Sequence, residues 1–228
     1  MLAISANSIK ANSIKDCHIA ALSAAGVSHA RFIAKEFSYP RGVEIYGEKE
    51  PADYVYQVTA GAVRTYKLLS DGRRQIGAFH LFEDVFGLEN SEVHRFTAEA
   101  VVDTKLRLIM RRSLESAAES DLLVARNLLN LTTNNLQHAE DHMLLLGRKT
   151  ARERVAAFLL EMDRRLMAAQ ILALPMCRRD IADYLGLTFE TVSRVLSNLQ
   201  ERGILGFIGT NQRQIVLLDR QKLASLDL

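Results

Sequence analysis

The residues of this 228-residue chain best suited to specific chemistry lie near its C-terminal end. Glu190, Ser193 and Arg194 follow one another at helical spacing, so they would share one face of a helix. An arginine there can form a bidentate pair with guanine, a glutamate can accept from cytosine N4, and a serine can bond to either kind of partner. A glutamate and an arginine four residues apart also occur as an ordinary ion pair on a solvated helix. The surrounding sequence has to decide between these two interpretations.

Residues 175–205 predict two short helices joined by a tight turn. Gly186 can supply the left-handed end of the first helix, and Thr188 can accept the first amide hydrogen bonds of the second. The second helix has an apolar face, formed by Val192, Val195, Leu196 and Leu199. Its opposite face is polar and consists of Glu190, Ser193, Arg194 and Ser197. This division favours a helix-turn-helix whose polar face reads base edges in a DNA major groove.

Other residues near the recognition helix are predicted to contact the DNA backbone or the edge of the site. They are Arg178, Thr188, Phe189, Thr191, Ser197, Gln212 and Arg213. Gln212 and Arg213 belong to the polar turn of a predicted β-hairpin wing over residues 204–218, and the tail from Asp219 predicts a short helix. The net charge is only +2, so DNA binding has to come from local basic clusters.

Residues 113–147 have a helical period and predict a long dimerisation helix. Alternating steps of three and four connect Leu122, Ala125, Leu129, Thr132, Leu136, Ala139, Met143 and Leu146. This 3.5-residue period is typical of the a and d positions of a two-stranded coiled coil, although such a stripe can also pack on its own domain. The predicted dimer contacts are Leu122, Leu129, Thr132, Leu136, Ala139 and Met143. A two-fold dimer would place two recognition helices about 34 Å apart and would bind a palindrome.

Short apolar runs between about residues 30 and 110 predict antiparallel strands. The runs cover residues 32–34, 42–46, 54–58, 62–67, 74–79 and 104–109. Asp71-Gly72 predicts a type I′ hairpin turn. Strands at this spacing favour an N-terminal jelly-roll β-barrel, so the expected fold class is α+β. The expected domains are a mobile segment 1–18, a barrel 19–112, the dimerisation helix 113–147 and a winged helix-turn-helix 148–228.

Residues 177–205 resemble the winged helix-turn-helix of the Crp/Fnr transcription regulators. Glu190, Ser193 and Arg194 match the E-x-x-S-R signature of the Fnr and FixK branch, and the resemblance is greatest to FixK-type proteins. Phe189 departs from that pattern, which often has an aliphatic residue there. The resemblance covers nearly the whole chain and implies a barrel shaped like a cyclic-nucleotide-binding domain. It also implies a TTGAT-N4-ATCAA-like palindrome and activation of transcription through RNA polymerase.

In that implied complex, Arg194 would read guanine, Glu190 the paired cytosine, and Ser193 a neighbouring thymine or phosphate. In relatives that bind cyclic AMP, a glutamate contacts the ribose and an Arg-Ser or Arg-Thr pair contacts the phosphate. Here Leu88 stands in place of that glutamate and Phe96 follows Arg95. The carboxylates of Glu83, Asp84 and Glu89 would also repel a cyclic phosphate. We therefore expect no requirement for cyclic AMP and no cofactor.

An alternative is a regulator gated by an effector, in which the barrel binds a small molecule or haem. His80 and His94 are the candidate haem ligands. His138 and His142 have a spacing that can hold a metal, but no third ligand is evident, so we expect no metal site. The chain also lacks known catalytic motifs, so we expect that it is not an enzyme. It lacks an apolar run long enough to span a membrane, so we expect that it is not a membrane protein.

The chain contains two cysteines, Cys17 and Cys177. Two widely separated cysteines do not form a disulfide framework, and they suit a reducing cytoplasm. Cys17 stands alone where an iron–sulfur cluster would need several thiolates. Cys177 precedes Arg178 and Arg179 at a predicted helix N-terminus, which favours a thiolate and makes Cys177 a candidate redox switch. The alternative is a small buried side chain without redox chemistry.

Overall fold

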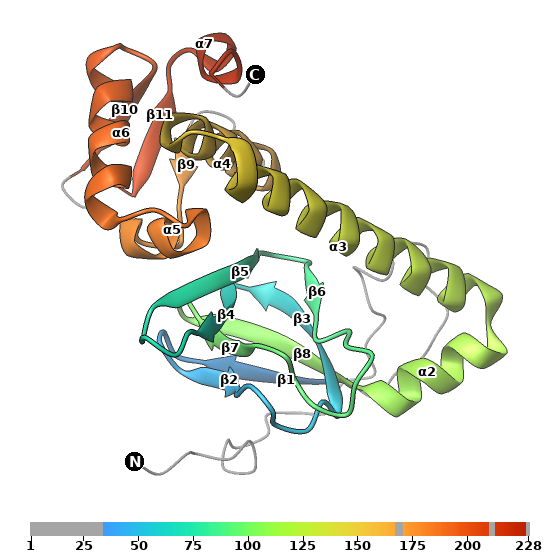
Figure 1. Ribbon diagram of the computed structural model, residues 1–228. Helices are drawn as coiled ribbons and strands as arrows, with labels where there is room; N and C mark the ends of the chain where they lie inside the picture. The colour runs from blue at the N-terminus through green and yellow to red at the C-terminus, as the bar shows by residue number, and fades with distance from the viewer. Residues whose placement is uncertain (1–33, 167–170, 210–212, 227–228) are drawn as a thin grey trace. The chain divides into compact units, whose positions relative to one another are not determined.

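The computed structural model describes residues 34–166, 171–209 and 213–226 (Figure 1). The chain forms two compact units. The first holds the described residues up to Lys67 together with Ala78–Gln137, and the second holds Leu68–Gly77 together with the described residues from His138 onward. The segment 1–18, predicted to be mobile, lies outside the described residues. The combination of sheets and helices confirms the expected α+β class.

Two four-stranded sheets form the first unit, except that the tip of one of their hairpins, Leu68–Gly77, belongs to the second unit (Figure 1). One sheet has the order β1-β8-β3-β6, formed by β1 (Ala34–Tyr39), β8 (Thr104–Met110), β3 (Tyr54–Ala60) and β6 (Val85–Phe86). The other has the order β2-β7-β4-β5, formed by β2 (Glu44–Tyr46), β7 (Thr97–Ala100), β4 (Val63–Leu68) and β5 (Arg74–His80). This arrangement confirms the predicted jelly roll, but the two sheets do not close into a continuous barrel.

The core of the first unit follows from the alternation of side chains along β3. Tyr56 and Val58 belong to the cluster between the two sheets, whereas Val55 belongs to a cluster on the other face of its sheet. The second cluster includes Leu114 of α2 (Arg111–Ser120) and Val124 of α3 (Leu122–Arg148). The two helices therefore cover the outer face of the β3 sheet.

The helical segment predicted over residues 113–147 is divided into α2 and α3 at Asp121. The Asp121 carboxylate Oδ1 accepts a hydrogen bond from the backbone N–H of Leu123 at 2.8 Å, so Asp121 stabilises the start of α3. The sequence has no glycine or proline at this point to indicate the break. At its other end α3 continues through Gly147 to Arg148.

The type I′ turn predicted at Asp71-Gly72 is wrong. A type I′ turn needs a positive φ at both central residues, but only Gly72 has one, at 83°. The N–H of Gly72 donates to the carbonyl of Leu69 at 2.9 Å, and the N–H of Leu69 donates to the carbonyl of Arg73 at 2.8 Å. The β4–β5 hairpin therefore ends in a wider loop with Gly72 in the left-handed region.

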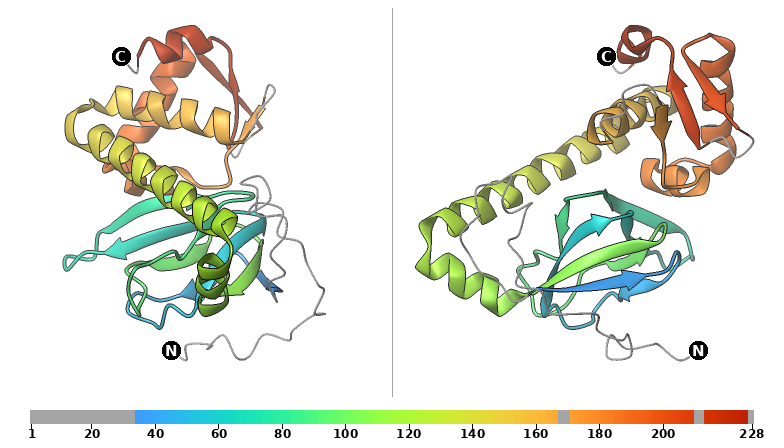
Figure 2. Two further views of the ribbon diagram at one scale, coloured as in Figure 1. Left: turned by 90° about the vertical axis from the view of Figure 1, so that its right-hand side faces the viewer. Right: turned by 180° about the vertical axis from the view of Figure 1, so that it is seen from behind.

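The second unit contains a helical core and a small antiparallel sheet. Its helices are the last turns of α3, α4 (Ala151–Arg165), α5 (Arg178–Leu185), α6 (Phe189–Glu201) and α7 (Arg220–Ala224). Figure 2 shows the sheet beside α6, with the order β10-β11-β9, formed by β10 (Leu205–Ile208), β11 (Gln214–Leu217) and β9 (Ile171–Ala173). The wing hairpin and the short final helix are confirmed, whereas the three-residue strand β9 was not predicted.

Candidate DNA-recognition site

Helix α5 and the turn after it form as their sequence predicts. Asp180 Oδ2 accepts the backbone N–H of Cys177 at 3.1 Å, which stabilises the first turn of the helix. Gly186 ends the helix in the left-handed conformation, with φ 61° and ψ 37°. The N–H of Leu187 then donates to the carbonyl of Ala182 at 3.0 Å. This turn directs the chain into α6.

Helix α6 begins at a capped N-terminus and buries one face. The hydroxyl of Thr188 accepts the N–H of Thr191 at 3.1 Å. Val192, Leu196 and Leu199 are buried, and the helix packs against α4, α5 and β10. The apolar face predicted for the second helix is therefore the face that docks on the unit.

The polar face of α6 leaves Glu190, Arg194 and Ser197 exposed. Glu190 and Arg194 form no ion pair with any residue of the described chain, so the interpretation as an ordinary intrahelical pair gains no support here. Ser193 lies differently, because its Oγ is buried and has no hydrogen-bond partner among the described residues. The structure thus exposes two of the three predicted base-reading side chains and keeps the hydroxyl of the third below the surface.

The predicted backbone-contact residues are distributed over several elements. Thr188 and Phe189 are exposed at the start of α6, and Thr191 is half-buried one turn further on. The guanidinium of Arg178 lies over the ring of Phe207 at 5.3 Å, and burial lowers its pKa. Arg213 is half-buried, whereas Gln212 falls outside the described residues.

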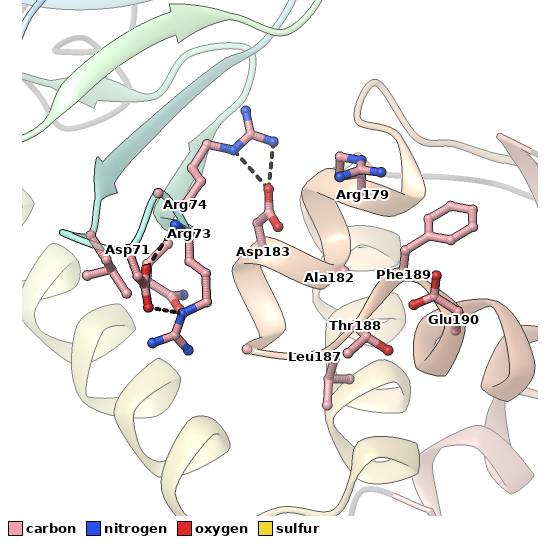
Figure 3. Close-up of a pocket in the computed structure, with 14 residues that line it drawn as sticks. Asp71, Arg73, Arg74, Arg179, Ala182, Asp183, Leu187, Thr188, Phe189 and Glu190 are labelled. Atoms are coloured by element: carbon pink, nitrogen blue, oxygen red, sulfur yellow. Dashed lines mark hydrogen bonds and ion pairs between the residues drawn. The ribbon is translucent and has the colours of Figure 1, made fainter.

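A groove of about 740 Å³ lies within the second unit, beside the start of α6 (Figure 3). The hairpin tip 68–77 and α5 line it together with Thr188, Phe189 and Glu190. Its charged side chains are balanced: the arginines are Arg73, Arg74 and Arg179, and the acids are Asp71, Asp183 and Glu190. Arg179 is exposed and lines the groove, but it was not among the residues predicted to contact DNA.

Cys177 is half-buried at the N-terminal end of α5. Its Sγ–H donates to the Asp180 carboxylate Oδ2, with Sγ and Oδ2 3.2 Å apart. The neighbouring arginines were predicted from the sequence to dominate the surroundings of this thiol. Asp180 was not considered, although it lies three residues further along the same helix, at the position where a capping carboxylate is expected. Cys17 falls outside the described residues.

The predicted dimerisation stripe lies on the exposed side of α3. Leu122, Leu129, Leu136 and Met143 are 86%, 65%, 57% and 66% exposed. Thr132 and Ala139, which continue the stripe, are exposed as well. The described residues cover a different face of α3, which includes Val124 and Leu145, so within the described part of the chain the stripe is not packed on its own domain.

Inside the first unit, the segment that corresponds to a phosphate-binding cassette is occupied by contacts within the chain. Glu89 accepts hydrogen bonds from the His94 ring at 2.6 Å and from the N–H of Arg95 at 3.0 Å. Burial alone would raise the pKa of Glu89, but these two hydrogen bonds, together with the electrostatic attraction of His94 and Arg95, outweigh burial and lower it. Glu89 is therefore held as a carboxylate.

The two candidate haem ligands also have partners. The His94 ring stacks on Tyr46 with a centroid distance of 3.5 Å, and its Nε2 is buried without a hydrogen bond from the described residues. His80 Nε2 lies 3.2 Å from the hydroxyl of Thr65, and its ring stacks on Phe86. Across residues 34–166, 171–209 and 213–226, no three His, Cys, Asp or Glu side chains are grouped to bind a metal ion. No helix in these ranges is long and apolar enough to cross a membrane.

Comparison with known proteins matches both units. Residues 36–121 match the cyclic nucleotide-binding domain, and residues 153–226 match the Crp-like helix-turn-helix domain. The nitrogen fixation regulation protein FixK of Rhizobium meliloti (strain 1021) is 42% identical over 205 residues, which cover 90% of this chain and 92% of that protein. FixK of Azorhizobium caulinodans is 46% identical over 194 residues, covering 83% and 77% of the two chains.

A solved structure, that of FixK2 from Bradyrhizobium japonicum, is 67% identical, has a TM-score of 0.83, and covers 86% of this chain and 98% of its own. The jelly roll, the winged helix-turn-helix and these relatives together define a DNA-binding transcription regulator. The chain belongs to the Crp/Fnr family. Within that family it is similar to the FixK proteins, as residues 177–205 indicated.

Proposed function

We propose that this regulator acts as a homodimer that binds a TTGAT-N4-ATCAA-like palindrome without cyclic AMP and activates transcription through RNA polymerase. The single observation that carries the proposal is the division of α6, which buries Val192, Leu196 and Leu199 and leaves Glu190 and Arg194 exposed. A helix anchored on one face and polar on the other is suited to enter a major groove.

Each base-reading residue has a separate role in the proposed complex. Arg194 donates two hydrogen bonds to guanine O6 and N7, and Glu190 accepts from N4 of the paired cytosine. Ser193 contacts a neighbouring thymine or a phosphate, for which its buried hydroxyl has to turn outward. Arg178, Thr188, Phe189, Thr191, Ser197, Gln212 and Arg213 supply contacts to the backbone and to the edge of the site.

The exposed stripe of α3 supports the homodimer. Four large apolar side chains repeat every seven residues along one face, which is the arrangement that packs against an identical helix in a coiled coil. In water such a stripe is unfavourable unless it is covered. We therefore assign Leu122, Leu129, Thr132, Leu136, Ala139 and Met143 to a dimer interface.

Independence from cyclic AMP is supported by the contacts around Glu89. Its carboxylate stays charged and bound to His94 and Arg95, at the place where a cyclic phosphate would have to bind. Leu88 replaces the carboxylate that would contact the ribose. A second anion in these surroundings would be repelled.

The activating role, the RNA polymerase partner and target genes connected with nitrogen fixation are proposed from the relatives, which bear the name nitrogen fixation regulation protein. A regulator of this kind acts where the chromosome and RNA polymerase are, so we place it in the cytoplasm. We assign it no enzymatic activity.

The test is a binding titration of the purified protein with three duplexes: the palindrome, a single half-site and a scrambled sequence. We expect tight binding to the palindrome, weaker binding to the half-site, and no change when cyclic AMP is added. Equal affinity for all three duplexes would contradict the proposal. Binding that appears only after an effector is added, or a visible absorbance band of the pure protein, would favour the effector-gated alternative.

A further inference from the structure

The hairpin tip 68–77 holds helix α5 through ion pairs of Arg74 with Asp180 and Asp183. Figure 3 shows the pair with Asp183. Arg74 Nε donates to Asp183 Oδ2 at 2.8 Å, and Nη2 donates to Asp180 Oδ1 at 2.7 Å. Asp180 and Asp183 are one turn apart on the same helix, so the planar guanidinium bridges two neighbouring carboxylates. Among the described residues, Arg74 is the cation that forms an ion pair with Asp183.

The three side chains are largely removed from solvent. Arg74, Asp180 and Asp183 are 19%, 6% and 24% exposed, respectively. Pairs on open surface contribute little, whereas removing one partner of a buried pair leaves a charge that is neither solvated nor compensated. Here the charge of Asp183 would remain, because Arg74 is the cation paired with it among the described residues.

The other contacts of α5 fix its C-terminal end. Gln75, next to Arg74, donates to the carbonyl of Tyr184 at 3.3 Å, and His142 of α3 donates to the same carbonyl at 2.9 Å. Arg154 of α4 donates to the carbonyl of Leu185 at 2.9 Å. At the other end of the helix, Asp180 accepts hydrogen bonds from Arg74 and from the backbone N–H and the Sγ–H of Cys177. Arg74 therefore ties the hairpin tip to α5 at two successive turns, through Asp180 and Asp183.

The position of α5 sets the position of α6, because the two helices pack together and the short turn at Gly186 joins them. We propose that Arg74 is a positioning residue for DNA recognition: by bridging Asp180 and Asp183 it holds α5 in the orientation from which α6 presents Glu190 and Arg194. Arg74 itself contacts no DNA.

The test compares Arg74→Met with Arg73→Met in the full-length protein. Arg73 is its sequence neighbour, but it is exposed and pairs with Asp71 within the same loop. Affinity is measured for the palindrome of the proposed function and for a scrambled duplex, each over a series of salt concentrations. We expect Arg74→Met to lose about three- to thirty-fold in affinity for the palindrome. Binding to the scrambled duplex and the salt slopes should be unchanged, and Arg73→Met should behave as wild type.

These readouts separate positioning from other roles of Arg74. A lost phosphate contact would lower the salt slope by about one and weaken both duplexes alike, which would overturn the proposal. A smaller folded fraction would also weaken binding to both duplexes alike, and in that case Arg74→Lys takes the place of Arg74→Met. Wild-type protein is titrated in parallel. If wild type does not prefer the palindrome to the scrambled duplex, the result counts against the proposed function and not against the role of Arg74.

A double-mutant cycle completes the test. In wild type, Asp183→Asn should weaken palindrome binding, whereas in the Arg74→Met background it should have little effect or restore affinity, because it removes an uncompensated charge. Additive losses would overturn the proposal. If Arg74→Met does not fold, Arg74→Lys takes its place, since lysine keeps the charge but cannot bridge both carboxylates in a fork. The proposal would then be overturned if folded Arg74→Lys bound the palindrome with wild-type affinity and the effect of Asp183→Asn were additive.

Discussion

Helices α6 and α3 both carry an apolar stripe, but the described part of the chain buries the stripe of α6 and leaves that of α3 exposed. Val192, Leu196 and Leu199 are nearly inaccessible to solvent, whereas Leu129 and Leu136 are more than half exposed. The two stripes look alike in the sequence. The difference shows that an apolar stripe predicts a contact but does not tell whether the partner lies in the same chain.

The largest expected effect comes from changing the uncovered stripe. The double substitution of Leu129 and Leu136 by glutamate would place like charges face to face in the coiled coil, which should dissociate the dimer. Loss of the second half-site should weaken palindrome binding about a hundred-fold or more. Sedimentation measures the dissociation and a titration measures the binding.

Leu144→Glu is the matched control for this double substitution. Leu144 is 60% exposed on the same helix but lies outside the a and d positions. Its replacement should leave the dimer intact. If the double variant stayed dimeric, α3 would not be the dimer interface and the proposed difference between the two helices would be lost.

The exposed face of α6 should be the next most sensitive part. Arg194→Ala removes the bidentate contact with guanine and should cost about 1–3 kcal/mol at the cognate site, with relaxed preference at the guanine position. Arg202→Ala, at the C-terminal end of the same helix, is the control and should not change base preference. An Arg194→Ala protein that still demands guanine would remove Arg194 from the reading face.

A smaller effect is expected at the N-terminus of α5. Oxidation of Cys177 to sulfinic acid would place a negative charge about where its Sγ now donates to Asp180, 3.2 Å away. We expect peroxide to weaken specific DNA binding several-fold in wild type and in Cys17→Ala, but not in Cys177→Ala. Equal inhibition of wild type and Cys177→Ala, or no reaction of native Cys177 with a thiol reagent, would refute a redox role.

The smallest expected effect is a pH dependence of stability at the junction of α3 and α5. Burial lowers the pKa of His142, although its hydrogen bond to the Tyr184 carbonyl and the charge of Glu161 oppose this shift. The unfolded chain then binds more protons than the folded chain just below the ordinary histidine pKa of about 6.5. The free energy of unfolding should therefore fall as the pH drops below that value.

Denaturant unfolding at several pH values measures this dependence. The slope of the free energy of unfolding against pH should correspond to the uptake of less than one proton, and His142→Gln should reduce this slope. His138→Gln is the control, because His138 is paired with Glu161 and is more open to solvent. An identical slope in wild type and His142→Gln would assign the dependence to other groups.

The sequence predicted the helix-turn-helix well because its signals are local. Gly186 and Thr188 lie within two residues of the turn they form, and the faces of α6 follow directly from helical periodicity. The break at Asp121 was missed because an aspartate inside a helical pattern is a weak signal. The buried hydroxyl of Ser193 depends on how the helix rotates on its support, which periodicity resolves only coarsely.

Contacts distant in sequence could not be predicted from local patterns. Arg74 and Asp180 are 106 residues apart, and nothing near either residue indicates the other. The pairing of β9 with β11 was missed for a similar reason, since three residues form too short a run to be recognised as a strand. Tertiary packing decides such contacts, and only the folded chain reveals them.

The most direct measurement is the selection of DNA from a random pool by the purified protein without any added ligand. A homodimer that reads DNA with the exposed face of α6 should enrich two inverted TTGAT-like half-sites separated by four base pairs, and Arg194→Ala should lose the guanine from that consensus. Enrichment of an unpaired half-site or of direct repeats, or enrichment only after cyclic AMP is added, would contradict the proposed mode of recognition.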